Sequence, residues 1–390
     1  MAVKDDMIEC KLCGKREHVI QKHLSAEHPE VSLDEYKERF PDAPILSPKA
    51  IEILAKRKQE NGTAGTATPT NSVPEVPFMK LDRRALNVVF DLGRARAAMG
   101  QNNNPIPITT YDPDDELKIY VEEVDPQYAF NIDLLKTVMM GIESNMPVYL
   151  WGHAGTGKST IFEQIAARTR HPFIRVQHTG NTEESEVVGQ WTVKDGQTVF
   201  ELGPLAFAMK HGLIYLADEY DFAMPAITAL YQPVLEGKAL IIKGADKENR
   251  IIHPHPMFRM VATGNTNGTG DESGLYQGTL IQNAANYERF GIVEQVHYMD
   301  AKTETQIIQS KHGVTEEDAK KMVSFAGMIR EAFGNGKIGL PVSPRAILNA
   351  AKNGNMRRSY RKGLELSYLN RLSSTDKMAA IEILDRLSIT

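Results

Sequence analysis

The sequence predicts an α/β fold, in which a parallel β-sheet flanked by helices is preceded by a small head and followed by a helical lid. From Phe130 onward, short apolar segments alternate with helical ones, as in parallel strands joined by crossover helices. After Asp300 the strand patterns stop and only helical ones remain. Near the N-terminus, two cysteines and two histidines stand close together and mark a separate unit.

Apolar and amphipathic patterns place the individual elements. The strands are predicted at residues 147–151, 172–177, 213–217 and 258–263, with a helix at 159–168. The helices of the lid are predicted at residues 303–311, 316–333, 344–353 and 376–387. Alternating residues around Asp195 and Gly196 predict a hairpin at 191–200, and a second hairpin is expected from segments 238–243 and 250–253.

Composition shifts divide the chain into four expected regions. They are a head at 1–58, a flexible linker with a short helix (83–99) at 59–115, an α/β domain at 116–300 and a helical lid at 301–390. Residues 61–77 are rich in Gly, Thr, Asn and Pro, so we expect a flexible tether there.

Overall composition excludes several classes of protein. The chain has 390 residues with 45 Lys and Arg against 50 Asp and Glu, so it has no general basic field for nucleic acid or anionic lipid. Its only two cysteines, Cys10 and Cys13, are too close in sequence to staple a secreted fold. The chain lacks an apolar run of about 20 residues and begins without a signal peptide pattern, which favours a cytoplasmic protein.

A glycine-rich segment follows the first predicted strand and precedes a predicted helix, which is the context of a phosphate-binding loop. Its glycines let backbone N–H groups surround a phosphate, while Lys158 neutralises charge on the β- and γ-phosphates and Ser159 offers a hydroxyl to Mg²⁺. The predicted ATP-binding residues are Gly152, His153, Ala154, Gly155, Thr156, Gly157, Lys158, Ser159, Thr160 and Asp218.

Two acids, Asp218 and Glu219, end the apolar strand at 213–217. Asp218 is expected to hold Mg²⁺ together with Ser159, and Glu219 is expected to activate the water that attacks ATP. Two adjacent acids at a strand end are usually only solvated, but their place after a phosphate loop predicts a hydrolytic site.

The ordered motifs of residues 120–390 resemble AAA+ ATPases of the MoxR and chelatase branch, and within it the family of the aerobic cobaltochelatase ATPase subunit, CobS. The supporting phrases are Gly155-Thr-Gly-Lys-Ser-Thr160, Asp218-Glu-Tyr-Asp221, His253-Pro-His-Pro256, Ala262-Thr-Gly-Asn-Thr266, Gly274-Leu-Tyr-Gln-Gly-Thr279, Glu288-Arg-Phe290 and Val342-Ser-Pro-Arg345. The resemblance implies an AAA+ fold with a C-terminal lid, assembled as a hexameric ring.

The resemblance also assigns three roles. It makes Asn265 the sensor that orients the lytic water, Arg289 the arginine finger that reaches a neighbouring subunit's ATP, and Arg345 a second sensor on the lid. A guanidinium suits the charge spread over a transferring phosphoryl group. An isolated subunit should therefore be nearly inactive.

In the resembled branch, hairpins such as those at 191–200 and 238–253 project from the ring and contact a substrate or partner. The alternative is that they extend the core sheet. The polar loop at 265–282 is expected to line a pore or an interface. The basic residues Arg357, Arg358, Arg361 and Lys362 form either a site for an acidic partner or a solvated face.

Cys10, Cys13, His23 and His28 have the spacing of metal ligands, and thiolates with imidazoles favour Zn²⁺. His18 is a competing candidate. The spacing resembles that of Ros/MucR-type zinc fingers. The ion is expected to supply much of the folding energy of so small a head. Residues 1–58 contain 11 Lys and Arg and 11 Asp and Glu, which favours docking to protein over binding to DNA.

The sequence therefore predicts an ATP hydrolase that remodels a partner protein in a bacterial or phage-infected cell, with ATP, Mg²⁺ and Zn²⁺ as cofactors. The family resemblance implies a CobT-like partner with a metal-ion-dependent adhesion-type domain and a role in metal chelation; a general MoxR-like chaperone is the alternative. A DNA-associated motor or loader targeted by the zinc finger is the rival from another class. A structural protein with an inactive ATP site is the third alternative.

Overall fold

The computed structural model describes residues 7–18, 20–28, 31, 33–40, 43–45, 47–48 and 79–390. It divides into two compact units, Met1–Val76 and Pro77–Thr390. The predicted tether at 61–77 lies outside the described residues.

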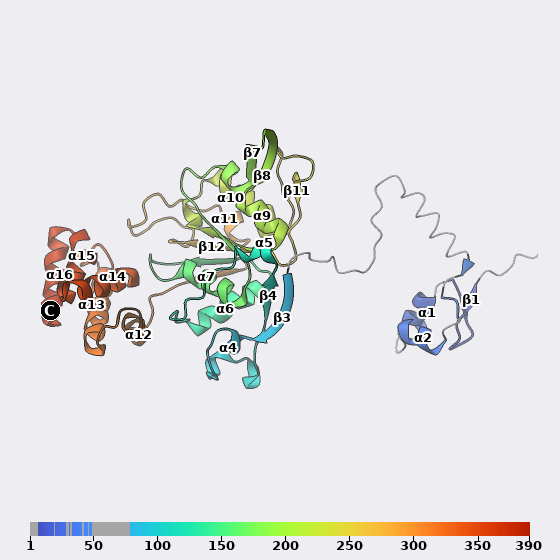
Figure 1. Ribbon diagram of the computed structural model, residues 1–390, viewed down its shortest axis with the longest axis horizontal. Helices are drawn as coiled ribbons and strands as arrows, with labels where there is room; N and C mark the ends of the chain where they lie inside the picture. Colours follow the sequence, from blue (N-terminus) through green and yellow to red (C-terminus); the bar gives the residue numbers. More distant parts are fainter. Residues whose placement is uncertain are drawn as a thin grey trace, which may run out of the picture. The chain divides into compact units, whose positions relative to one another are not determined.

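The larger unit is built on a five-stranded parallel sheet, which confirms the predicted α/β fold (Figure 1). All four neighbouring strand pairs are parallel. The order across the sheet is β13 (Ile292–Gln295), β5 (Val148–Trp151), β12 (Arg259–Gly264), β9 (Ile214–Asp218) and β6 (Phe173–Gln177). The four strands expected from the sequence lie within one residue of their predicted ends, and the edge strand β13 is additional.

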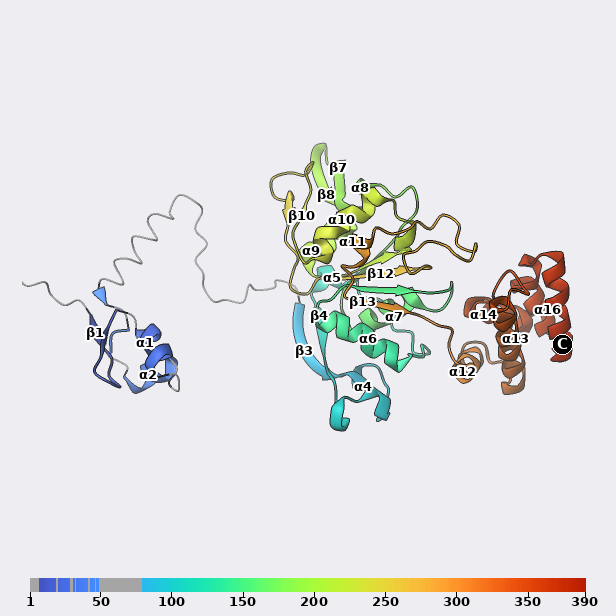
Figure 2. The same cartoon turned by 180° about the vertical axis from the view of Figure 1, so that it is seen from behind.

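Helices cover both faces of this sheet (Figures 1 and 2). One face packs against α6 (Ile132–Glu143) and α7 (Lys158–Thr169), and the other against α9 (Pro204–His211) and α10 (Pro225–Leu235). Because side chains alternate along a strand, Leu216 joins the first of these two cores and Tyr215 the second. Polar residues lie at the carboxyl ends of three strands: the phosphate loop follows β5, Asp218 and Glu219 lie at the end of β9, and Asn265 follows β12.

Residues 79–113 differ from the linker and helix expected there. β3 (Met79–Ala85) and β4 (Pro107–Pro113) pair as antiparallel strands, with α4 (Leu86–Val89) and two 3-10 turns, Arg96–Ala98 and Gln101–Asn103, between them. The Glu143 carboxylate on α6 accepts hydrogen bonds from Arg83 and from the backbone of Thr109. These contacts with the α/β core override the local helical pattern, so the prediction of a helix over 83–99 was wrong.

The lid consists of five helices around its own apolar core. They are α12 (Ala301–His312), α13 (Glu316–Gly334), α14 (Pro344–Arg357), α15 (Tyr360–Ser367) and α16 (Ser374–Arg386). Each begins after a residue whose side chain accepts a hydrogen bond from the first turn; these are Asp300, Thr315, Ser343, Ser359 and Ser373. The four predicted lid helices are confirmed. Among the helices of the described residues, none is both long enough and apolar enough to cross a membrane.

Both predicted hairpins are present. β7 (Gly189–Lys194) pairs with β8 (Gln197–Leu202) around Asp195 and Gly196, whose φ angles are 52° and 76°. β10 (Leu240–Ile241) pairs with β11 (Ile251–Ile252). Trp191 Nε1 donates to the carbonyl oxygen of Gly244 at 2.8 Å and joins the two hairpins. The remaining short elements of this unit are α5 (Asp115–Lys118), α8 (Glu184–Val188), α11 (Ala284–Tyr287) and the 3-10 turns Tyr220–Phe222 and Leu369–Arg371.

The head contains an antiparallel pair, β1 (Ile8–Glu9) and β2 (Arg16–Glu17), followed by α1 (Ile20–Glu27) and α2 (Leu33–Arg39). Its buried core among the described residues consists of Ile8, Cys10, Ile20, Leu24 and Tyr36. Tyr36 is fully buried, and its hydroxyl accepts the Lys11 N–H at 2.9 Å.

Candidate functional site

The phosphate loop joins β5 to α7, as its sequence predicts. Gly152 and Gly157 have φ angles of 143° and 90°, a region that favours glycine. A Cβ atom at Gly152 would also collide with the carbonyl oxygen of Val296. The Thr156 hydroxyl donates to the His153 carbonyl oxygen at 2.9 Å. The backbone therefore turns tightly at the N-terminus of α7, where peptide N–H groups attract anions.

Lys158 begins α7, and its side chain folds back into the phosphate loop. Its Nζ donates to the carbonyl oxygens of Gly152 at 2.7 Å and His153 at 3.0 Å, and to Asn265 Oδ1 at 3.2 Å. Burial lowers the pKa of Lys158 to about 8, although nearby carboxylates oppose that shift. Phosphate charge placed beside this amine would favour its protonated form.

The two predicted magnesium ligands lie in direct contact. Asp218 Oδ1 accepts a hydrogen bond from Ser159 Oγ at 2.7 Å and another from the Thr263 hydroxyl. Asp218 Oδ2 accepts from Arg175 Nε at 2.7 Å. Carboxylate and hydroxyl oxygens are hard donors of the kind that Mg²⁺ prefers. The pair therefore fits a magnesium ion held beside the phosphates.

Glu219 follows the last residue of β9 and has a φ angle of 54°. Its Oε2 accepts a hydrogen bond from Gln177 Nε2 at 3.0 Å, and its backbone N–H donates to Thr263 Oγ1 at 3.3 Å. Glu219 lines the polar cavity next to the phosphate loop, together with Lys158 and Ser159.

Asn265 comes directly after β12. Its backbone N–H and that of Thr266 donate to Asp221 Oδ2 at 2.8 and 2.9 Å. Asp221 is fully buried, and burial raises the pKa of its carboxyl. By accepting these two bonds, the Asp221 carboxylate fixes the backbone at the start of the loop. The Asn265 side chain there accepts a hydrogen bond from Lys158.

Two cavities adjoin the phosphate loop, and Gly155, Gly157, Thr160 and Arg345 line both. One has a volume of about 270 Å³ and a polar lining that includes Ala154, Lys158, Ser159, Asp218, Glu219 and Asn265. The other has a volume of about 200 Å³ and includes the apolar or aromatic residues Tyr128, Ile307, Ile308 and Leu348. A polar cavity beside an apolar one fits a nucleotide with its phosphates in the first and its base in the second.

Arg345 lies in the first turn of α14, the third helix of the lid. A Cβ atom at Gly155 would lie 3.6 Å from the Arg345 Cβ and 3.0 Å from the Ser343 Cβ. The lid therefore reaches the phosphate loop at this point, and the predicted second sensor lies at the nucleotide cavities.

Arg289 is the one predicted catalytic residue that lines neither cavity. Its Nε donates to Glu236 Oε1 at 2.6 Å, and its Nη1 donates to the Ala285 carbonyl oxygen. Glu236 caps the C-terminal end of α10 and also pairs with Lys238. The guanidinium thus lies away from the ATP site of its own subunit.

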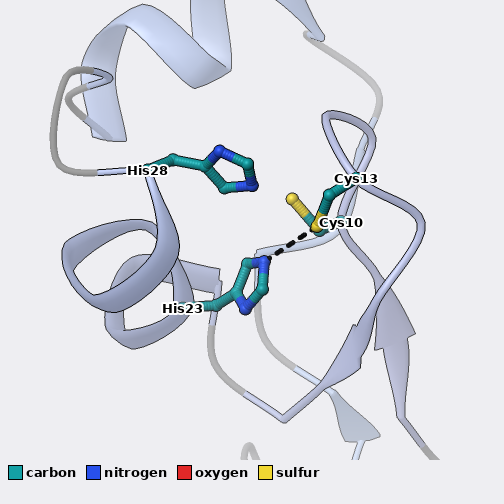
Figure 3. A group of neighbouring side chains, drawn as sticks. All are labelled: Cys10, Cys13, His23 and His28. Carbon is teal, nitrogen blue, oxygen red and sulfur yellow. Dashed lines mark hydrogen bonds between the residues drawn. The ribbon is translucent and has the colours of Figure 1, made fainter.

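The four predicted zinc ligands converge in the head (Figure 3). The ligand atoms of Cys10, Cys13, His23 and His28 all lie within 4.8 Å of one another, and Cys13 Sγ lies 3.1 Å from His23 Nε2. Ligands of a tetrahedral zinc ion are about 3.3–3.8 Å apart, so this set fits such an ion. The competing candidate His18 bonds through Nδ1 to Ser47 Oγ at 2.8 Å instead.

Four residues without a role predicted from the sequence also contact site residues: Arg175, Gln177, Asp221 and Tyr276. One signal was available: residues two apart on a strand lie on the same face of the sheet, so Arg175 and Gln177 of β6 share a face. Asp221 lies only three residues after Asp218. Tyr276 gave no comparable signal, because its contact crosses more than 120 residues of sequence.

Comparisons with known proteins agree with this geometry. Residues 147–279 match the AAA domain of the dynein-related subfamily, and residues 304–382 match the C-terminal domain of the CbbQ, NirQ and NorQ proteins. NorQ of Paracoccus denitrificans is 25% identical over 208 residues, which are 53% of this chain and 73% of that protein. The von Willebrand factor A domain-containing protein 8 of Mus musculus is 27% identical over 235 residues, which are 57% of this chain but only 12% of that protein.

The aerobic cobaltochelatase subunit CobS of Sinorhizobium sp is 34% identical over 274 residues, which are 67% of this chain and 81% of CobS. The match to the AAA domain at residues 147–279 includes the phosphate loop and the acidic end of β9. On this similarity, the chain is an ATP-hydrolysing P-loop enzyme and belongs to the CobS family of MoxR-type AAA+ ATPases.

Proposed function

We propose that this ATPase works as a hexameric ring that uses ATP hydrolysis to remodel a partner protein. The observation that carries the proposal is the position of Arg289. It lies outside both nucleotide cavities of its own subunit and is paired with Glu236 on the surface. A finger in that position completes a site only when a second subunit presents its cavity.

Within each site the residues have separate tasks. Lys158 and the backbone of the phosphate loop hold the phosphates, and Ser159 with Asp218 holds magnesium, which neutralises the developing charge. Glu219 accepts the proton of the attacking water, and Asn265 orients that water. Arg345 contacts the nucleotide from the lid, so the lid changes position as ATP is bound and hydrolysed.

The partner is proposed to carry a von Willebrand factor A-type domain, like the CobT-type partner implied by the family. Support comes from the mouse relative, whose single chain contains both a matching segment and such a domain. A role as the motor of a metal-chelatase complex follows the likeness to CobS. The head is proposed to bind zinc through its Cys and His cluster. It is also proposed to dock protein rather than DNA, because residues 1–58 have equal numbers of acidic and basic residues.

A trapping experiment tests this function. The Glu219→Gln variant should bind ATP without hydrolysing it, assemble into a particle larger than the 43.5 kDa subunit, and retain a partner that carries a von Willebrand factor A-type domain. The matched Lys158→Ala variant should bind no ATP and should not retain the partner. A particle that stays monomeric with ATP would contradict the ring. Tight, steeply salt-dependent DNA binding by the full chain, lost on chelation, would favour the DNA-associated motor instead.

A further inference from the structure

The loop of residues 266–282, which connects β12 to α11, is tied at both ends to one residue. At its start, the Thr266 N–H donates to Asp221 Oδ2 at 2.9 Å. Near its end, the Leu280 N–H donates to the Asp221 carbonyl oxygen at 2.7 Å. The Gln282 N–H donates to the Gly268 carbonyl oxygen at 2.8 Å and closes the base. The loop therefore leaves the hydrolytic centre at Thr266 and returns to it at Leu280, with both ends held by hydrogen bonds to Asp221.

The middle of this loop returns to the phosphate loop through Tyr276. The Tyr276 hydroxyl lies 3.1 Å from the Ala154 nitrogen and 3.0 Å from His153 Nδ1. Asp271 Oδ2 accepts the Tyr276 N–H at 2.6 Å and fixes the turn that carries the ring. The Tyr276 side chain thus contacts two successive residues of the phosphate loop.

The donor and acceptor pattern of this contact is specific. The Ala154 N–H can only donate, so the Tyr276 oxygen accepts from it. The Tyr276 hydroxyl donates to His153 Nδ1 when the ring proton is on Nε2, and accepts from Nδ1 in the other tautomer. Burial lowers the pKa of His153, which keeps the imidazole neutral at neutral pH, and the Tyr276 hydroxyl can bond to Nδ1 in either neutral tautomer. Phenylalanine at position 276 would keep the ring and lose both bonds.

We propose that Tyr276 is a positioning residue for ATP binding, which holds the start of the phosphate loop and couples it to the loop at 266–282. The bonds order Ala154 and His153 before ATP arrives, so binding does not have to order them. The proposal rests on ATP binding at the phosphate loop, which is part of the proposed function, and does not depend on the ring or the partner. By linkage, whatever orders the 266–282 loop raises ATP affinity, and ATP orders the loop by the same factor.

The test compares Tyr276→Phe with Tyr298→Phe in the full chain. The Tyr298 ring stacks on the same imidazole, with ring centroids 5.8 Å apart. Tyr298→Phe therefore removes a hydroxyl beside the same side chain and serves as the matched control. Tyr276→Phe should raise the Kd and the KM for ATP about 10-fold and leave kcat within about 2-fold, since it removes two hydrogen bonds from the binding step only. Tyr298→Phe should change neither constant by more than about 2-fold.

A second measurement follows the loop itself. Cleavage by a glutamate-specific protease at the exposed Glu272 should slow when ATP binds to the native chain, and ATP should give less protection in Tyr276→Phe. An unchanged Kd in Tyr276→Phe, an equal effect of Tyr298→Phe, or equal protection in both proteins would overturn the proposal. A native chain that binds ATP tightly but forms no ring would refute the proposed function and leave the role of Tyr276 intact.

Discussion

Removal of Arg330 from the lid should be strongly destabilising. Arg330 on α13 makes a two-pronged ion pair with Glu304 on α12, with Nη1–Oε2 and Nη2–Oε1 distances of 2.8 and 2.7 Å. The two side chains are only 14% and 4% exposed. Arg330 Nε also donates to the Val342 carbonyl oxygen at 2.9 Å, and its guanidinium lies 4.1 Å from the centroid of the Tyr298 ring.

Arg330→Ala would leave the Glu304 carboxylate buried without its cation, a change that costs about 3–5 kcal/mol. With a urea m-value of about 2 kcal/mol/M, the unfolding midpoint of the lid should fall by about 2 M. Urea unfolding followed by circular dichroism at 222 nm measures this shift, because the lid is helical. The ATP KM should also rise, since Glu304 lines the apolar nucleotide cavity.

The double variant Arg330→Met with Glu304→Met is the control. Replacing both charges by apolar side chains of similar length removes the buried charge, so it should cost far less than Arg330→Ala alone. A midpoint that changes by less than about 0.3 M in Arg330→Ala would refute the reasoning, because the ion pair would then contribute no more than an exposed one.

Three further outcomes are expected. Metal analysis should find one zinc per chain, and Cys13→Ser or chelation should unfold the head while ATP hydrolysis persists; joint loss of both would contradict a separate metal-dependent unit. Burial lowers the pKa of His171 to about 3, so the folded state resists protonation and the free energy of unfolding should fall by about 2 kcal/mol between pH 6.5 and 5. His171→Gln should flatten that pH dependence, and an unchanged slope would contradict it. Glu219→Gln should abolish turnover yet bind ATP with native Kd by titration calorimetry, whereas Lys158→Ala should lose binding; turnover in Glu219→Gln would exclude it as the base.

Most of the ATP site could be predicted because its chemistry is local in sequence. The phosphate loop follows an apolar strand and precedes a helix, and the acids Asp218 and Glu219 end another apolar strand. Parallel strands bring their carboxyl ends to one edge, so these segments meet without any knowledge of tertiary contacts. The cluster of Cys and His side chains in the head could be predicted for the same reason, since its four members lie within 19 consecutive residues.

The remaining features depend on contacts between distant segments. Residues 83–85 pair with residues 107–109 in the β3–β4 sheet, so a local helical pattern there was misleading. The edge strand β13 has only two apolar residues, Ile292 and Val293, and forms by pairing with β5. The ion pair of Arg289 with Glu236 spans 53 residues of sequence, and nothing local to either residue predicts it.

The central claim is that one subunit's Arg289 completes the ATP site of its neighbour, and mixing two inactive variants tests it most directly. Arg289→Ala keeps an intact cavity but lacks the finger, and Lys158→Ala keeps the finger but binds no ATP. Each variant alone should be inactive, and mixed assemblies should regain part of the native ATPase rate. Mixed assemblies with no activity, or full activity of Arg289→Ala alone, would contradict it.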